Sequence, residues 1–267
     1  MTDLITQVES ERHHVVVDVY SATLNELMEQ YSRGDLEIDP AYQRAFRWEI
    51  PQQTRYIESL LLNIPTPPFF LAETKEGKFE IIDGLQRFST VIKFFANELS
   101  NTEVKASDSL ESQNNIEIPS LLTEAPILKG LKGESRATLP DTLIRTLRYA
   151  RVQVMLLKKE SSPLARFHVF TRLNRAGSNL SNQEIRNCSA RLTNPEWADK
   201  LLELANLPAI ISAMGLSEKD YKSMGVAENL LRLLAFSNFK PTTQRVDEFL
   251  DDAMYKASAG ILKFRKT

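Results

Sequence analysis

The sequence predicts an α+β protein, in which strands and helices over residues 1–160 are followed by an all-helical subdomain over 161–267. Two observations predict this division. The runs rich in β-branched and aromatic residues, which are typical of strands, all lie before residue 158. Each later segment begins instead with a helix N-cap. Two units of this kind fit a chain of 267 residues, of which 42% are hydrophobic.

The first strand and the first helix follow from the residues after position 13. "HVVVDVYS" supplies a β-branched run for a strand, and "TLNELMEQYSRG" then supplies a helix. Thr23 is the expected N-cap of this helix, Glu26 completes a capping box, and Gly34 ends the helix. "LEI" predicts a second, short strand.

A second helix and a β-hairpin come next. Pro51 opens the helix "PQQTRYIESLLLN", which packs Ile57, Leu60 and Leu61, and "IPTPP" ends it. "FFLAE" and "KFEIID" flank a turn that contains Gly77, which predicts the hairpin. The helix that follows has an apolar face made of Phe88, Val91, Ile92, Phe95 and Leu99.

An acidic insertion precedes the last strand. Between residues 98 and 124 six acidic residues stand against Lys105 alone, so we expect a solvated, mobile insertion over 98–125. After it, "TLPD" predicts a short helix capped at Thr138 and Asp141, and "RVQVMLL" predicts the strand.

Four caps mark the helices of the C-terminal subdomain. They are Ser162 with Pro163, Ser181 with Glu184, Asn194 with Pro195, and Ser217 with Asp220. Between residues 166 and 191 five arginines stand against Glu184 alone. This charge predicts either a basic local surface or a solvated helical face, and both stay open.

Composition excludes several classes of protein. A single cysteine, Cys188, excludes an internal disulfide, and three histidines do not assemble a zinc site without carboxylate ligands. No apolar run approaches the ~20 residues of a membrane helix, and the N-terminus lacks a basic start with an apolar block, so we expect a cytoplasmic protein without a membrane partner. The ending "ILKFRKT" carries no stop signal, and continuation past residue 267 stays open.

The stretch "DGLQRFST" is the first candidate for a binding site. Asp83 is the expected N-cap, and Gln86 completes a capping box. Gly84 disfavours a helix by up to about 1 kcal/mol relative to alanine, and the charge of Arg87 opposes the helix dipole. A phosphate at this helix end would account for both residues. The alternative pairs Arg87 with a carboxylate elsewhere in the fold.

Two further stretches concentrate polar and aromatic side chains. "DPAYQRAFRW" could stack a base and grip its phosphates, or its aromatics could anchor a long loop while Arg44 binds carbonyl groups. "FHVFTRLNRAGSNLSNQEIRNC" joins two predicted helices through Gly177. Its polar residues predict either a surface that meets a ligand or a plain helical hairpin, and they are Asn174, Arg175, Gln183, Arg186 and Asn187.

Taken in order, "DPAYQRAFRW", "IESLLLNIPTPPFFL", "FEIIDGLQRFSTVIKFF" and "FTRLNRAGSNLSNQEIRN" resemble domain of unknown function 262, the N-terminal domain of GmrSD-type restriction enzymes. The resemblance runs from about residue 15 to about 190. It implies a ParB/sulfiredoxin-like fold that binds a nucleoside triphosphate with Mg²⁺, coupled to DNA restriction or antiviral defence. It also implies DNA as a partner and a nuclease domain or subunit supplied by another protein.

On this resemblance the leading hypothesis is a nucleotide-binding, weakly NTP-hydrolysing sensor or switch. The residues expected to contact the nucleotide are Gly84, Gln86, Arg87, Tyr42, Gln43, Arg44, Asn174, Gln183 and Arg186. Catalytic roles fall on Asp83, Arg87 and Arg44, in which Arg44 would neutralise charge on the leaving phosphate. Asp83 and Glu184 are the candidates for binding Mg²⁺ or orienting a water.

The sequence departs from the family pattern at two points. Leu85 stands where many members have a glutamine, which weakens the case for hydrolysis more than the case for binding. No histidine follows His168, so we expect no C-terminal HNH nuclease. The first alternative is a non-catalytic DNA-binding or partner-binding module that uses Arg44, Arg47 and residues 166–191. The second is a ParB-like DNA nuclease, for which the motifs supply few carboxylates.

Overall fold

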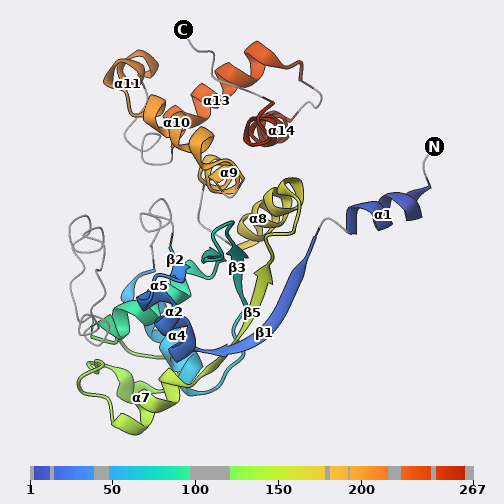
Figure 1. The fold of residues 1–267 in the computed structure, drawn as a ribbon. Helices are drawn as coiled ribbons and strands as arrows, with labels where there is room; N and C mark the ends of the chain where they lie inside the picture. Colours follow the sequence, from blue (N-terminus) through green and yellow to red (C-terminus); the bar gives the residue numbers. More distant parts are fainter. Residues whose placement is uncertain are drawn as a thin grey trace. The chain divides into compact units, whose positions relative to one another are not determined.

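The computed structural model describes residues 3–12, 15–38, 48–96, 121–177, 181–191, 193–215, 224–241 and 245–261. The chain divides into two compact units (Figure 1). The sheet unit comprises residues 17–159, and the helical unit comprises residues 1–16 with 160–267. The predicted α+β class is confirmed.

A five-stranded mixed sheet forms the centre of the sheet unit, in the order β1-β5-β3-β4-β2. Its strands are β1 (Val17–Thr23), β2 (Leu36–Glu37), β3 (Phe69–Glu73), β4 (Phe79–Asp83) and β5 (Arg151–Leu157). β5 pairs antiparallel with β1 and parallel with β3, β3 pairs antiparallel with β4, and β4 pairs parallel with β2. The predicted hairpin is confirmed as β3 and β4, with Gly77 at φ 82° in its turn.

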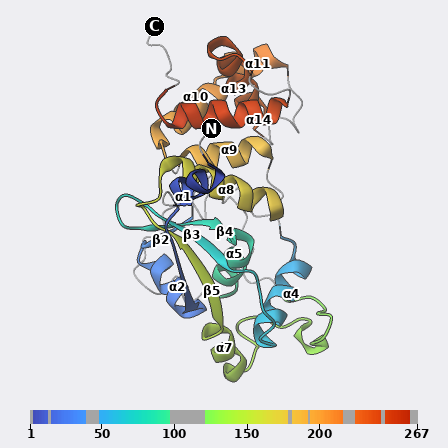
Figure 2. The ribbon, with the colours of Figure 1, turned by 90° about the vertical axis from the view of Figure 1, so that its right-hand side faces the viewer.

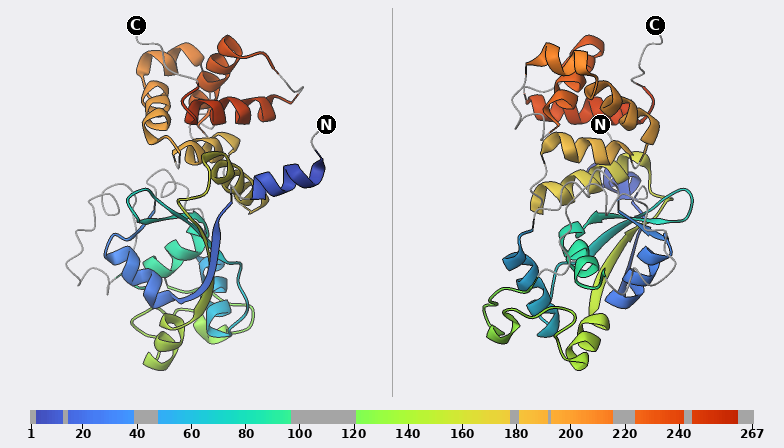
Figure 3. Two further views of the ribbon diagram at one scale, coloured as in Figure 1. Left: turned by 45° about the vertical axis from the view of Figure 1, so that its right-hand side comes forward. Right: turned by 90° about the vertical axis from the view of Figure 1, so that its left-hand side faces the viewer.

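Helices cover one face of this sheet. They are α2 (Leu24–Ser32), α4 (Ile50–Leu61) and α5 (Leu85–Phe94), while α7 (Asp141–Arg148) and a 3₁₀ turn, η1 (Lys129–Leu131), precede β5. α2, α4 and α5 lie on the same side of the strands (Figures 1 and 3), and the ring of Tyr31 on α2 contacts that of Phe88 on α5 at 5.7 Å. In β5, buried Val152 and Val154 alternate with exposed Arg151 and Gln153, as a half-covered sheet requires.

Most local signals in the sheet unit are confirmed. Thr23 and Glu26 form the predicted capping box at the start of α2, and Gly34 follows that helix at φ 73°. Of the apolar face predicted for α5, Phe88, Val91 and Phe95 are buried. Ile92 is only partly buried, and Leu99 lies outside the described residues.

One prediction for residues 98–141 is wrong. The cap of α7 is Pro140, and the hydroxyl of Thr138 instead accepts the N–H of Ser135 at 2.8 Å. The insertion predicted over 98–125 lies outside the described residues up to residue 120, and its mobility stays a prediction. Leu122 is buried and its main chain bonds to Glu134 and Gly133, because residues 121–139 pack as a closed loop.

The helical unit is built around α9. Its helices are α1 (Leu4–Arg12), α8 (Pro163–Gly177), α9 (Asn182–Arg191), α10 (Pro195–Ala205), α11 (Pro208–Met214), α13 (Gly225–Asn238) and α14 (Val246–Ser258). α9 packs between α8 on one side and α10 and α14 on the other (Figure 2). The apolar core contains Phe167, Trp197, Leu201 and Phe249.

Three of the four caps predicted for the helical unit are confirmed. Ser162 accepts the N–H of Ala165 at 3.1 Å, Ser181 and Glu184 form a capping box, and Asn194 accepts the N–H of Trp197 at 3.2 Å. The fourth, Ser217 with Asp220, lies outside the described residues. α1 was not predicted from the sequence, and its apolar side chains Leu4, Ile5 and Val8 are exposed.

Candidate functional site: the β4–α5 turn

The turn between β4 and α5 is centred on Gly84. Gly84 is the N-cap of α5, and its φ of 103° is one that residues with a side chain rarely adopt. A Cβ atom at this position would lie 2.5 Å from Cδ1 of Phe69. Backbone conformation and packing therefore explain this glycine without a ligand. The capping box predicted for Asp83 and Gln86 is wrong, and no side chain of the described residues caps α5.

Arg87 is buried and its charge is compensated locally. Its Nη1 donates to the carbonyl of Pro67, and its Nη2 donates to the carbonyl of Pro68 at 3.1 Å and lies 3.3 Å from Oδ2 of Asp83. The guanidinium also stacks over the ring of Phe69, 4.8 Å from its centroid. Burial lowers the pKa of Arg87, and the charge of Asp83 opposes this shift. The carboxylate partner of Arg87 thus lies within the turn itself.

Gln86 ties a second predicted cluster to this turn. Its Oε1 accepts the main-chain N–H of Trp48 at 3.0 Å, and Nε2 of Gln53 on α4 donates to the carbonyl of Trp48 at 2.8 Å. The end of "DPAYQRAFRW" is therefore fixed beside the first turn of α5. Tyr42, Gln43 and Arg44 lie outside the described residues, and their roles stay predictions.

Tyr56 belongs to the same cluster but was missed from the sequence. Its ring makes an edge contact with Trp48 at 5.9 Å between centroids, and its side chain is buried. Among the described residues its hydroxyl has no hydrogen-bond partner. Burial strongly raises the pKa of Tyr56, so the hydroxyl keeps its proton. The spacing of Tyr56 with Ile57 and Leu60 indicates a buried face of α4, but it carries no signal for the unpartnered oxygen.

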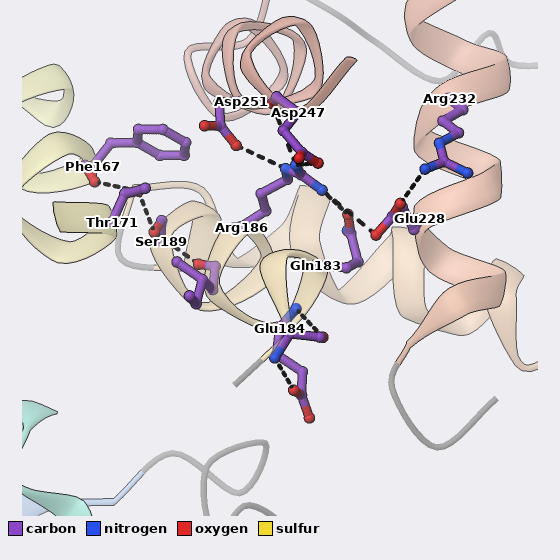
Figure 4. Close-up of polar contacts among 12 residues, drawn as sticks. Phe167, Thr171, Gln183, Glu184, Arg186, Ser189, Glu228, Arg232, Asp247 and Asp251 are labelled. Carbon is purple, nitrogen blue, oxygen red and sulfur yellow. Dashed lines mark hydrogen bonds and ion pairs between the residues drawn. The ribbon is translucent and has the colours of Figure 1, made fainter. Parts of the chain in front are cut away.

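The third cluster forms a buried ion network in the helical unit. The side chain of Arg186 is fully buried, with Nε 2.8 Å from Oδ1 of Asp251 and Nη2 3.1 Å from Oδ1 of Asp247. Nη1 lies 3.7 Å from Oε2 of Glu228 and donates to Gln183 at 3.4 Å. Figure 4 shows these side chains converging from α9, α13 and α14. The structure brings the predicted residues Gln183 and Arg186 together, but inside the helical unit.

The remaining predicted residues of this cluster lie apart from the network. Glu184 accepts the N–H of its own cap residue Ser181 at 2.6 Å and points away from Arg186 (Figure 4). Asn174 and Arg175 belong to the part of α8 whose side chains the structure does not describe. No group of three potential metal ligands occurs among the described residues.

The arginines that the structure describes between residues 166 and 191 differ in their surroundings. Arg166 and Arg186 are buried, and Arg191 lies 3.5 Å from Asp199. Arg172 is exposed, as a solvated helical face requires. The four side chains do not form a common basic surface, because acidic residues of α10, α13 and α14 pair with two of them.

Comparison with known proteins gives one match. The family model described as the GmrSD restriction endonuclease, N-terminal domain, matches residues 24–190, more than half of the chain. No curated protein and no solved structure matches it. The matched range includes the β4–α5 turn and all of α9 except its last residue, Arg191. Among the described residues, no helix has the length and apolarity needed to cross a membrane.

Proposed function

The chain belongs to the family of GmrSD restriction endonuclease N-terminal domains, and we propose on this premise that it is a nucleotide-binding sensor or switch module of a DNA restriction or phage-defence system. The proposed site is the N-terminus of α5. The observation that carries this choice is that a helix of ten residues has a glycine as its N-cap and, among the described residues, no side-chain cap.

The physical basis is the chemistry of a helix end. The first N–H groups of a helix have no intrahelical partner, and the aligned peptide dipoles make this end positive. A phosphate satisfies both conditions. Because Asp83 and Arg87 compensate each other, the carboxylate does not leave a net negative charge beside the ligand. The positive end of the α5 dipole then attracts the phosphate without opposition from a nearby net negative charge.

In this proposal Arg87 stabilises the turn and also has N–H groups left for the ligand. A guanidinium has five N–H groups, and three contacts go to Pro67, Pro68 and Asp83. Five minus three leaves two N–H groups for a phosphate oxygen. Its first task is to hold the turn, and its second is to bind the nucleotide.

Mg²⁺ fits Asp83 better than Glu184. Mg²⁺ is commonly held by one or two carboxylates together with phosphate oxygens. The side chain of Asp83 is 35% exposed beside the proposed phosphate site, whereas both main-chain and side-chain atoms of Ser181 engage Glu184 in a capping box. Mg²⁺ would neutralise phosphate charge there. Arg44 would stabilise the leaving phosphate, and buried Leu85 supplies no polar group for a water, so we expect slow hydrolysis.

A titration of the protein with ATP, GTP, CTP and UTP in the presence of Mg²⁺ tests the proposal. We expect at least one nucleotide to bind with an affinity that depends on Mg²⁺ and on the base. The competing function is a DNA-binding module, whose affinity would fall steeply with salt because counterions are released. Salt-sensitive binding of duplex DNA together with no binding of any nucleotide would exclude the proposal.

A further inference from the structure

The hydroxyl of Tyr56 is a polar group that the described fold does not use. Tyr56 is 5% exposed, and its oxygen makes no hydrogen bond to any residue that the structure describes. Buried polar groups in folded proteins are nearly always paired, because an unpaired one loses its bonds to water without replacement. An unpaired hydroxyl beside a candidate ligand site therefore indicates a missing partner.

The side chain of Tyr56 is linked to the start of α5 through Trp48. Tyr56 contacts Trp48, and the main chain of Trp48 is bound by Gln86 in the first turn of that helix. α4, which carries Tyr56, packs against α5. The charge of Arg87 also acts on Tyr56, where it lowers the pKa against the larger effect of burial. The start of α5, Arg87 and Tyr56 therefore belong to one cluster.

We propose that the Tyr56 hydroxyl donates a hydrogen bond to a phosphate oxygen of the nucleotide held at the N-terminus of α5. This inference rests on the proposed function and adds a residue to its site. Tyr56 stays protonated because burial raises its pKa. It therefore offers a neutral donor, which suits an anion and does not repel Arg87.

Access to the hydroxyl requires a neighbouring side chain to move. Trp48 is partly buried, and the described contact of its indole is the ring contact with Tyr56. The described hydrogen bonds of Trp48 are made by its main-chain N–H and carbonyl groups. Rotation of this indole therefore breaks no described hydrogen bond. Trp48 is the side chain that we expect to move when the nucleotide enters.

Tyr56→Phe tests the proposal because it removes one oxygen and keeps the ring. We expect its affinity for the nucleoside triphosphate and for inorganic tripolyphosphate to fall about tenfold or more, the effect of losing a hydrogen bond to a charged group. We expect its melting temperature to stay the same or rise. Tyr31→Phe is the matched control, because Tyr31 is partly buried and its ring contacts Phe88 of α5. It should bind both ligands as the wild type does.

Four outcomes would overturn the inference. Wild-type affinity in Tyr56→Phe would overturn it and leave the proposed function intact. A lower melting temperature would show that the hydroxyl has a partner inside the folded protein. Weaker binding of the nucleotide with unchanged binding of tripolyphosphate would place the contact on the base or sugar. If the wild type binds neither ligand, the inference and the proposed function fail together.

Discussion

Nη2 of Arg87 lies 3.3 Å from Oδ2 of Asp83, one helical turn earlier in the chain. The basic residue in the first turn of α5 is therefore compensated by the residue that ends β4. The same guanidinium holds the carbonyls of Pro67 and Pro68 just before β3. Arg87 thus joins both strands of the hairpin to α5, and its position at the positive end of a helix has a structural cause.

Arg87→Ala should lower the free energy of unfolding by about 2–4 kcal/mol, because it leaves two carbonyls and a carboxylate without their donor. Arg87→Lys should lose less, since an ammonium keeps the charge but cannot reach all three acceptors. Urea denaturation measures both. Stability of Arg87→Ala within about 0.5 kcal/mol of the wild type would show that these contacts contribute little.

Arg186→Met should destabilise the helical unit by about 3 kcal/mol, because it leaves the carboxylates of Asp247, Asp251 and Glu228 without their shared cation. Trp197 lies in the core of that unit and reports its unfolding by fluorescence, most cleanly in a Trp48→Phe background. Arg172→Ala, at an exposed position, is the control and should stay within about 0.5 kcal/mol. Equal effects of the two substitutions would contradict the buried network.

Glu58→Ala should detach residues 121–139 from α4. Oε1 of this buried glutamate accepts the N–H of Ile127 at 2.7 Å and that of Leu128 at 2.6 Å. We expect a loss of about 2–4 kcal/mol and faster hydrogen exchange at both amides. Glu58→Gln keeps an acceptor and should lose less. Unchanged exchange at Ile127 and Leu128 in Glu58→Ala would refute this anchoring role.

Acid should weaken the sheet unit through Glu73. Its close ion pair with Lys158, in which Nζ lies 2.8 Å from Oε2, lowers the pKa of Glu73 from its ordinary value of 4.5. A lowered folded-state pKa gives stability that is present above the ordinary value and is lost as the pH falls through the folded-state value. Denaturation of the wild type and Glu73→Gln at several pH values between about 6 and 2 measures this.

Glu73→Gln should show a shallower loss of stability with falling pH than the wild type. Asp18→Asn, which removes an exposed carboxylate of β1 that joins no ion pair among the described residues, should keep the wild-type slope. Parallel curves for the wild type and Glu73→Gln would mean that the Glu73 ion pair does not contribute to acid sensitivity.

Strands and helix caps that depend on neighbouring residues alone could be predicted from the sequence. The strand at 151–157 and the capping boxes at Thr23 and Ser181 needed only local residues. The similar pattern at Asp83 failed, because Gly84 adopts a left-handed conformation against Phe69 and becomes the N-cap itself. Nothing local to residues 83–86 encodes that contact with β3.

The pairing of buried charges could not be predicted, because some of the partners are distant in the sequence. The acidic partners of Arg186 on α14 lie 61 and 65 residues later in the chain. The sequence around α9 therefore does not reveal that the charge of Arg186 is paired within the fold. For Arg87 the sequence leaves a phosphate at the helix end open as the partner, with a carboxylate elsewhere in the fold as the alternative. That alternative is close to what the structure has, except that the partner is adjacent. Pairing of charges needs the fold, whereas helix caps do not.

The most direct test of the central claim is the affinity of Gln86→Glu for the preferred nucleoside triphosphate with Mg²⁺. Glutamate keeps an acceptor for the N–H of Trp48 and favours the helix dipole, so the fold should persist, but its charge repels phosphate. We predict that Gln86→Glu lowers the affinity about tenfold or more. Gln153→Glu, the same change at an exposed position of β5, should bind the nucleotide as the wild type does. Wild-type affinity in folded Gln86→Glu would contradict the assignment of the nucleotide site to the N-terminus of α5.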